Sequence, residues 1–183
     1  MSDKGLTQYE AYLRGDEYAL EELVHRYSDP LIRYIYCFVQ DASTAEELME
    51  DTIVTLIMKR KRLDTGDKLH GYLYKIARNK AIDHLRWRKR FVPLEDLQNV
   101  LSPGSLEDDH ARRARDEAVY ACIQALPSQY RQILHLTWFE GFSLPESAKI
   151  MGKSAKQIYN LHTRAKAALK STLIKEGIDH EDL

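Results

Sequence analysis

Residues 69–90 read LHGYLYKIARNKAIDHLRWRKR, and the rest of the chain is organised around them. Their apolar residues recur every three or four positions, the period of one face of an α-helix. These residues are Leu69, Tyr72, Leu73, Ile76, Ala77, Ile82 and Leu85. The opposite face carries Asn79, Trp87 and the cations Lys75, Arg78, Lys80, Arg86, Arg88, Lys89 and Arg90. Because phosphates bind cations and bases bind rings and amides, this face predicts a nucleic-acid site; the alternative is an ordinary solvated helix face.

The composition is that of a globular protein with one domain or two small ones. The chain has 183 residues, of which 44% are hydrophobic and 30% charged. Helical periodicity dominates, and no stretch alternates as strands do, so we expect an all-α fold. The N-terminus carries no signal sequence, and the most apolar run, LIRYIYCFV, is short and contains Arg33. We therefore expect a cytoplasmic protein that does not enter a membrane.

The cysteines and histidines give no sign of a reactive centre. Cys37 and Cys122 lie far apart in apolar helical stretches, which predicts two buried free thiols. No spacing of cysteine and histidine suits a zinc site. We expect no metal, no cofactor and no catalytic residue.

Charge is segregated along the chain, although the formal net charge is only −1. Residues 1–58 hold 4 basic and 12 acidic side chains, whereas residues 59–90 hold 12 basic and 3 acidic ones. Residues 91–119 are acidic again, and residues 120–183 are weakly basic. Because local field steers association, this pattern predicts one surface for a polyanion and another for a basic partner.

The N-terminal part predicts two or three helices before residue 40. Residues 6–14 form a short one, and Asp16 is a candidate N-cap of the next. A core stripe then passes through Pro30, which either starts a further helix or kinks a continuous one. The stripe consists of Leu20, Leu23, Val24, Tyr27, Leu31, Tyr34, Ile35 and Phe38.

The segment Ser43-Thr44-Ala45-Glu46 has the capping-box pattern and predicts a helix from Thr44 to about Arg62. Four carboxylates gather near its start: Glu46, Glu47, Glu50 and Asp51. They could hold magnesium for phosphoryl chemistry, but acids are common in a first helical turn, and no nucleophile or phosphate-binding loop accompanies them. Docking of a basic protein partner is the favoured interpretation.

A second basic cluster, Lys59-Arg60-Lys61-Arg62, ends this helix, and a loop over residues 63–68 leads into the stretch at 69–90. Tyr72, Tyr74 and Trp87 follow close by. Two basic clusters that flank a loop, with rings beside them, predict an electropositive groove with stacking platforms for a single strand.

Residues 92–113 are rich in proline, glycine, serine and acids and have no apolar period. This composition predicts an acidic flexible linker. We therefore expect two small helical domains, residues 1–91 and 114–176, followed by a tail over residues 177–183.

The second domain predicts a helix-turn-helix. Ser143 to Glu146 form another capping box, and the turn at Gly152 separates a short helix from a long one that starts at Ala155. Polar residues suited to phosphates and base edges are Lys153, Lys156, Gln157, Asn160, Arg164 and Lys166. Tyr159 and His162 are further candidates, and His162 could equally be a surface imidazole without a partner.

The whole chain resembles a bacterial RNA polymerase sigma factor of the extracytoplasmic-function (ECF) group, in the sigma-70 superfamily. Three stretches carry the resemblance: STAEELMEDTIVTLI, GYLYKIARNKAIDHLRWRKR and LPSQYRQILHLTWFEGFSLPESAKIMGKSAKQIYNLHTRAKAAL. The resemblance implies a non-enzymatic DNA-binding specificity subunit. Such a subunit binds core RNA polymerase, recognises a promoter and helps to melt it.

The resemblance also implies site residues. Residues 1–91 would be the region-2 domain, and Glu47, Glu50 and Asp51 in it would dock on core polymerase. The melted non-template strand of the minus-ten element would meet the loop before Leu69 and a set of α-helical residues: Tyr72, Arg78, Asn79, Asp83, Arg86, Trp87 and Arg88. Residues 114–176 would be the region-4 domain, which contacts minus-35 duplex DNA through Lys153, Lys156, Gln157, Tyr159, Asn160 and Arg164. An anti-sigma factor is a further partner that the resemblance allows.

Two other interpretations remain open. A dimeric helix-turn-helix transcriptional regulator would act on duplex DNA without polymerase docking, but it would need no single-strand groove at residues 69–90. A protein-only regulator descended from a sigma factor is favoured by the weakly basic recognition helix.

The chain also departs from the family at Ser147, where the scaffold helix usually has an aliphatic residue.

Overall fold

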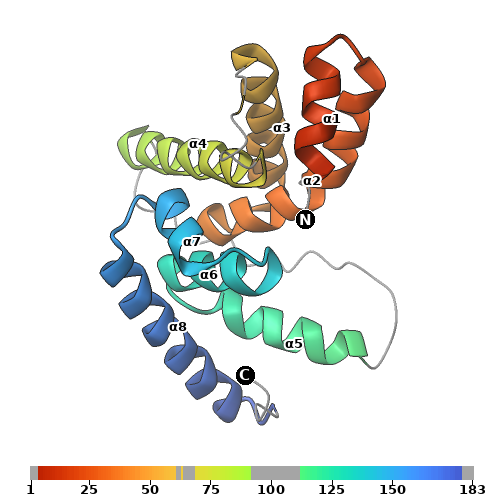
Figure 1. Cartoon of the computed structure of the whole chain (residues 1–183). Coiled ribbons are helices and arrows are strands. Elements are labelled where there is room, and N and C mark those ends of the chain that lie inside the picture. The colour runs from red at the N-terminus through yellow and green to blue at the C-terminus, as the bar shows by residue number, and fades with distance from the viewer. Residues whose placement is uncertain (1–3, 61–62, 64–68, 92–111, 179–183) are drawn as a thin grey trace. The chain divides into compact units, whose positions relative to one another are not determined.

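A computed structural model of the protein describes residues 4–60, 63, 69–91 and 112–178 (Figure 1). Every regular element in these ranges is helical, which confirms the all-α fold. The chain divides into two compact units, residues 1–102 and 103–183. Within the described ranges, no helix combines the length and the apolar character that a membrane span needs.

In the described part of the first unit there are four helices: α1 (Lys4–Leu13), α2 (Glu17–Val39), α3 (Ala42–Lys59) and α4 (Leu69–Phe91). The second unit holds α5 (Arg112–Gln124), α6 (Ser128–Leu134), the π-helical turn η2 (His135–Phe139), α7 (Leu144–Met151) and α8 (Ala155–Lys175). The expected linker lies outside the described ranges except for its last two residues, which already belong to α5. Residues 64–68 of the expected loop, the cations Lys61 and Arg62, and most of the expected tail also lie outside them.

The core of the first unit forms around α2, which packs against α1, α3 and α4. Six of the eight residues of the predicted core stripe are buried, and Leu20 and Val24 are half-buried. Asp16 caps α2 as predicted, because its side chain accepts a hydrogen bond from the Ala19 backbone N–H at 3.3 Å. The buried thiol of Cys37 lies in the same core, and both cysteines are buried and free.

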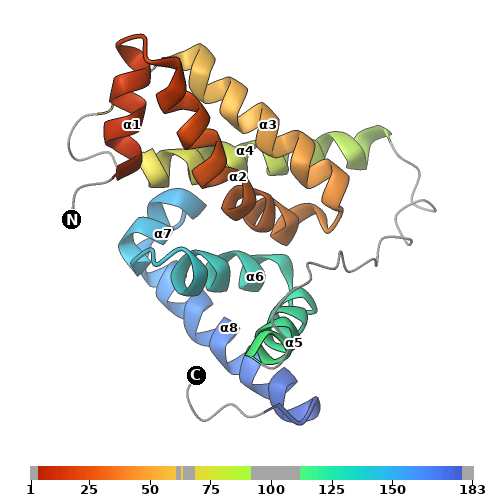
Figure 2. The same cartoon turned by 90° about the vertical axis from the view of Figure 1, so that its right-hand side faces the viewer.

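Pro30 lies inside α2, so the two helical stretches are one helix, and its ribbon changes direction along its length (Figure 2). Proline removes a backbone donor from the helix and crowds the preceding turn. In that turn the Ser28 hydroxyl donates to the Val24 carbonyl at 2.6 Å, a bond that favours bending.

The start of α3 differs from the prediction. Asp41 is the N-cap, and its carboxylate accepts the Thr44 backbone N–H at 2.8 Å, so the helix begins two residues before Thr44. The capping box predicted at Ser43 is therefore wrong. Asp41 and Ser43 are both good N-cap residues. The capping-box pattern favoured Ser43, because Glu46 lies three residues after it and no acidic residue lies three residues after Asp41. The helix ends at Lys59, and Arg60 adopts a left-handed cap conformation.

The second unit contains the predicted helix-turn-helix. Ser143 and Glu146 form the predicted capping box of α7. Gly152, at φ +63°, ends α7 in the left-handed conformation that glycine adopts most readily. Ser154 and Gln157 form a second capping box at the start of α8, which the sequence analysis did not anticipate. The turn and the start of the long helix are thus fixed from both sides.

One local feature of the second unit was not predicted. After Leu134, the helix α6 changes to the π-helical turn η2. The buried His135 lies at this change, with its Nε2 atom 3.1 Å from Glu140 Oε1. Polar pairing inside the unit therefore fixes the segment that leads to Gly141 and the helix-turn-helix.

Candidate functional site

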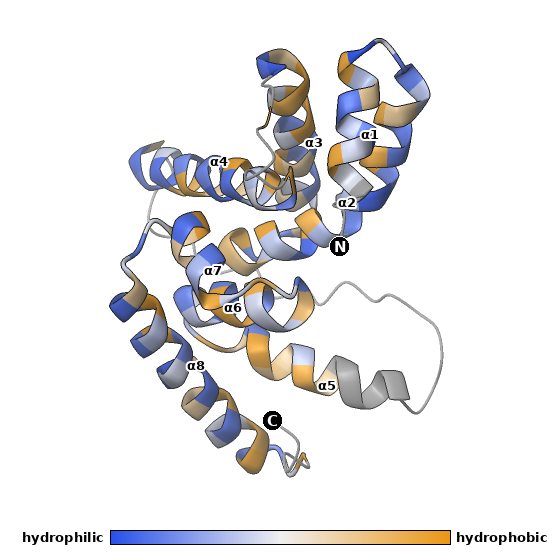
Figure 3. Ribbon diagram, in the orientation of Figure 1, coloured by the Kyte–Doolittle hydropathy of each residue, from blue (hydrophilic) through white to orange (hydrophobic). Residues whose placement is uncertain are grey.

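The basic helix α4 buries one face and exposes a polar stripe. Its buried residues are Leu69, Leu73, Tyr74, Ile76, Ala77 and Ala81. Lys75, Asn79, Asp83, Arg86 and Arg90 are exposed at spacings of three and four residues. Most of the α4 ribbon has the colour of hydrophilic residues, and apolar residues form narrow bands along it (Figure 3). Three of the predicted minus-ten residues, Asn79, Asp83 and Arg86, thus lie on one accessible stripe.

Tyr74 does not belong to the predicted groove. Its side chain is fully buried, with its ring 5.0 Å from the Tyr34 ring and 4.9 Å from the His70 ring. Tyr74, Ala77 and Ala81 follow the helical spacing of the face that packs on α2. The prediction of a stacking platform at Tyr74 is wrong, because an aromatic residue on the core side was assigned to the solvent side.

Tyr72 and Arg78 are only half-exposed. Burial raises the pKa of Tyr9, and the neighbouring Tyr72 and Tyr12 raise it further. Burial raises the pKa of Tyr34, and the positive charge of the nearby Arg78 acts against this rise. The Arg78 Nε atom is itself buried without a hydrogen-bond partner. Both side chains are therefore partly committed to the first unit.

A cluster around Arg60 was not predicted. The Arg60 guanidinium lies over the Tyr12 ring at 5.7 Å, and the Tyr12 and Tyr9 rings are 6.3 Å apart. A cation placed over a ring in this way is attracted by the ring's negative face. Arg60, the second member of the expected basic cluster, thus contacts α1, and the regular spacing of residues 6–14 contained no sign of this contact.

The expected docking residues lie on the exposed side of α3. Glu47 and Glu50 are exposed, and the apolar Val54 and Met58 continue their stripe toward the end of the helix. The sequence analysis missed these two, although they are apolar residues that lie off the core face at helical spacing. Together the four form an acidic and apolar surface, which we call the α3 stripe.

Asp51 has a partner within the first unit. Its Oδ2 atom lies 3.3 Å from Lys80 Nζ on α4. The hydrogen bonds from Thr44 lower the pKa of Asp41, and the charges of Arg88 and His84 on α4 act in the same direction. The predicted docking residue Asp51 thus helps to join α3 to α4 through its ion pair with Lys80.

The acidic start of α3 was also weighed as a magnesium site. Across the ranges that the structure describes, no three His, Cys, Asp or Glu side chains are grouped so that they could hold a metal ion. Glu46, Glu47 and Glu50 are spread along exposed helix surface, and Asp51 binds Lys80. Their arrangement suits a surface for a partner better than a coordination sphere.

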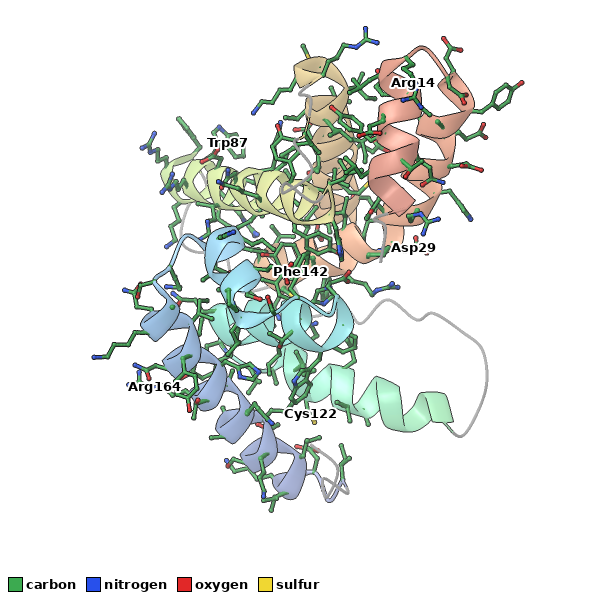
Figure 4. All side chains as sticks on the ribbon, in the orientation of Figure 1. Arg14, Asp29, Trp87, Cys122, Phe142 and Arg164 are labelled. Atoms are coloured by element: carbon green, nitrogen blue, oxygen red, sulfur yellow. The ribbon has the colours of Figure 1, made fainter. Side chains whose placement is uncertain are left out.

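The first turns of α8 present most of the predicted duplex contacts. Lys156, Gln157, Tyr159, Asn160 and Arg164 are exposed, and Lys153 in the turn is half-buried. Arg164 extends from α8 among other polar side chains (Figure 4). The opposite face buries Ile158, Ala165, Leu169 and Leu173. This is the division of faces that a recognition helix needs.

Three side chains of this region have additional structural contacts. Gln157 Oε1 accepts the Ser154 backbone N–H at 2.9 Å, which leaves the amide donors for a base. Lys166 lies over the Trp138 ring at 6.0 Å, beside a small hollow of about 120 Å³ between these residues and Lys170. Burial lowers the pKa of His162, and Lys166 acts in the same direction, so this half-buried imidazole is neutral at pH 7.

Both halves of the chain match family profiles. Sigma-70 region 2 matches residues 23–91, and Sigma-70, region 4 matches residues 116–169. The first match disfavours a regulator that acts through a helix-turn-helix alone.

Curated relatives match most of the chain. The RNA polymerase sigma factor SigZ of Bacillus subtilis is 28% identical over 161 residues, covering 88% of this chain and 89% of the relative. The ECF RNA polymerase sigma factor BldN of Streptomyces coelicolor is 30% identical over 166 residues, covering 87% of this chain and 62% of the relative.

Two solved structures share the fold. The sigma factor RpoE of Bartonella quintana, in its complex with the anti-sigma factor NepR, has a TM-score of 0.69 at 21% identity and covers 84% of this chain and 95% of that one. CnrH, in complex with the cytosolic domain of CnrY, has a TM-score of 0.65 at 22% identity and covers 93% and 97%.

Proposed function

The chain belongs to the ECF group of the sigma-70 family, and from that premise we propose that it binds core RNA polymerase and directs it to a promoter. One observation carries the proposal: a single helical unit presents an acidic and apolar stripe on α3 and a basic polar stripe on α4. A subunit that joins a polymerase to DNA needs two such surfaces of different chemistry.

The α3 stripe is the polymerase contact in this proposal. Glu47 and Glu50 supply the charge that attracts a basic surface, and Val54 and Met58 supply apolar area beside it. In a contact of this mixed kind, the charges speed association with the partner, and the apolar side chains are buried in the interface. Asp51 contributes to the same surface, and its pairing with Lys80 limits how much it adds.

The α4 stripe is the minus-ten contact. The Asn79 amide can form hydrogen bonds with a base, and the Asp83 carboxylate can accept a hydrogen bond from a base amino group. Arg86 and Arg88 supply positive charge, and Trp87 supplies an aromatic ring. Tyr72 and Arg78 border this stripe from half-buried positions. A melted base requires such contacts, because unpairing costs a few kcal/mol.

The helix-turn-helix is the minus-35 contact. α8 is 21 residues long, and its N-terminal turns carry Lys156, Gln157, Tyr159, Asn160 and Arg164, with Lys153 in the turn before them. Recognition helices meet base edges through these turns, and nearby lysines bind phosphate.

The polymerase supplies the chemistry of transcription, so this chain acts without a catalytic centre of its own, in the cytoplasm.

An anti-sigma factor is an additional partner in this proposal. The solved structure of RpoE of Bartonella quintana contains the anti-sigma factor NepR. A regulator of this kind would cover the same surfaces that polymerase and DNA require.

The direct test is transcription in vitro with core polymerase, in the presence and absence of the full-length chain, on native upstream DNA. Initiation at defined start sites that requires the chain, together with co-elution of chain and core polymerase, is the expected result. Failure to bind core and to initiate at any site would overturn the proposal. DNA binding should also weaken steeply as salt rises. Contacts with phosphates release counterions from the DNA, and this release is less favourable at high salt concentration.

A further inference from the structure

The side chain of Gln157 is held in one orientation at the start of α8. Its Oε1 atom accepts the Ser154 backbone N–H at 2.9 Å, and the Ser154 hydroxyl accepts the Gln157 backbone N–H at 3.2 Å. Because a backbone N–H only donates, the carboxamide atom that faces it is the carbonyl oxygen. The capping box therefore fixes which end of the Gln157 side chain turns back to the protein.

Gln157 lies on the surface that we assign to duplex DNA. Gln157, Asn160 and Arg164 are exposed at spacings of three and four residues, so they share one stripe of α8, whereas Ile158 and Ala165 are buried. Base edges meet the first turns of a recognition helix. Since its oxygen is engaged, Gln157 presents the Nε2 amine, with its two donors, to a base.

A glutamine that only donates reads DNA differently from a free glutamine. A free glutamine pairs with adenine through both ends of its carboxamide, because adenine offers the N7 acceptor beside the N6 donor. With the oxygen engaged, the N6 contact is lost and two donors face each other. Guanine offers two acceptors, N7 and O6, whereas cytosine offers the N4 donor. A donor-only side chain therefore favours guanine and disfavours cytosine.

The capping box opposes a change of this orientation on binding. The backbone donors at the start of a helix have no partner within the helix, and the Gln157 oxygen satisfies one of them at Ser154. Turning the oxygen toward a base would break that hydrogen bond. A side chain that is already ordered also loses less conformational entropy when it binds. The orientation that favours guanine is thus prepared before DNA arrives.

Resting on the proposed minus-35 binding, we propose that the Ser154–Gln157 capping box makes Gln157 a guanine-selective contact in the minus-35 duplex. Ser154 is a positioning residue, because it acts on the base through Gln157. Guanine should be preferred over cytosine at one base pair by about 5-fold or more, the lower end of what a good contact between a side chain and a base contributes.

Glutamate at this position inverts the chemistry and keeps the cap. Gln157→Glu retains an oxygen for the Ser154 N–H, but its carboxylate can only accept hydrogen bonds. Duplexes with about ten randomised base pairs, one helical turn of DNA, are mixed at low salt with the full-length chain and core polymerase, and the retained duplexes are sequenced. We expect Gln157→Glu to replace guanine by cytosine at one base pair. An unchanged preference, as a contact between Gln157 and a phosphate predicts, would overturn the proposal.

The added charge needs a matched control. Ala155→Glu places the same charge in the same exposed helical turn, outside the capping box. Repulsion from phosphates should weaken retention of all duplexes by this variant, and the preferred base should stay guanine. A change from guanine to cytosine in Ala155→Glu would contradict the inference, because charge alone would then explain the result for Gln157→Glu.

Ser154→Pro tests the positioning role. Proline lacks the N–H that holds the Gln157 oxygen, and the Ser154 φ angle of −70° is one that proline adopts. The released Gln157 should accept adenine as well as guanine at the same base pair. Ser154→Thr keeps both the N–H and a hydroxyl, so it should keep guanine alone. Guanine alone in a Ser154→Pro chain that circular dichroism shows to be folded would contradict the positioning role; if that variant does not fold, Gln157→Glu decides.

Parallel measurements separate this inference from the proposed function. Transcription with core polymerase, and retention of the duplex pool by the chain alone, are measured on the unsubstituted chain and on Gln157→Glu. Initiation with a base preference that Gln157→Glu leaves unchanged would refute the inference alone. A change from guanine to cytosine with the chain alone, without binding to core, would refute polymerase binding alone. No preferred duplex with or without core polymerase would refute both.

Discussion

Lys80 Nζ on α4 lies 3.3 Å from Asp51 Oδ2 on α3, so an ion pair joins the proposed DNA-binding helix to the proposed docking helix. The two side chains remain 35% and 59% exposed, which keeps the pair hydrated and weak. At the N-cap of α3, the hydrogen bonds from Thr44 lower the pKa of Asp41, and the charges of Arg88 and His84 on α4 act in the same direction. The two surfaces of the first unit are thus built on one framework.

A double-mutant cycle tests the ion pair. We expect Asp51→Asn and Lys80→Met to show a coupling of about 0.2–1 kcal/mol in the free energy of unfolding, because water screens exposed pairs. Urea denaturation followed by circular dichroism would measure it. A coupling above about 2 kcal/mol would mean that the pair is a structural element, and that Asp51 cannot serve as a simple docking residue.

Asp41 connects stability to pH. Asp41→Ala should cost about 0.5–2 kcal/mol, whereas Asp41→Asn should keep most of the cap, because asparagine caps helices about as well as aspartate. The pKa of Asp41 is lowered in the folded chain. Its charge therefore stabilises the fold above the unfolded carboxyl pKa of about 3.9, and this contribution is lost as pH falls through the lower folded pKa.

Thermal unfolding of both Asp41 variants between pH 7 and pH 2 would check this sign. Asp41→Asn should lose less stability on acidification than the unsubstituted chain. A steeper acid loss in Asp41→Asn would contradict the interaction with Thr44, Arg88 and His84.

Ser147 has a buried hydroxyl without a hydrogen-bond partner. Removing an unsatisfied buried polar atom is close to neutral or stabilising, so Ser147→Ala should keep or raise the melting temperature of the second unit, by up to a few degrees. Thr137→Val is the control, because the Thr137 hydroxyl donates to the Ile133 carbonyl at 2.9 Å and its loss should destabilise. Calorimetry would compare them. A clear loss of stability in Ser147→Ala would show that the hydroxyl is satisfied in solution.

Much of the fold could be predicted because its signals are local. Asp16, Ser143 and Gly152 act within one helical turn of their own positions, so capping chemistry alone located three helix boundaries. Periodicity also identified the core stripe of α2. Pro30 allowed either a new helix or a kink in a continuous one. The sequence could not decide between them, because the outcome depends on which helices pack against α2.

The site was predicted less completely, because tertiary contacts decide which faces are available. Tyr74 was assigned to the surface, yet its ring packs on Tyr34 from α2, which is 40 residues earlier in the chain. Lys80 pairs with Asp51 on α3, 29 residues earlier in the chain, and no local pattern indicates that pairing. The division of α4 into a partly paired side and an open stripe emerges only when α2 and α3 are in place.

The central claim is that α3 and α4 carry two separable functions, and one paired measurement tests it. Glu47→Lys with Glu50→Lys changes the α3 stripe, and Asn79→Ala with Arg86→Ala changes the α4 stripe; all four residues are exposed. For each full-length variant, affinity for core polymerase and open-complex formation on a promoter are measured side by side. We predict that the α3 variant loses core binding, whereas the α4 variant binds core as before and forms few open complexes. Unchanged core affinity in the α3 variant, or loss of core binding in the α4 variant, would contradict the account.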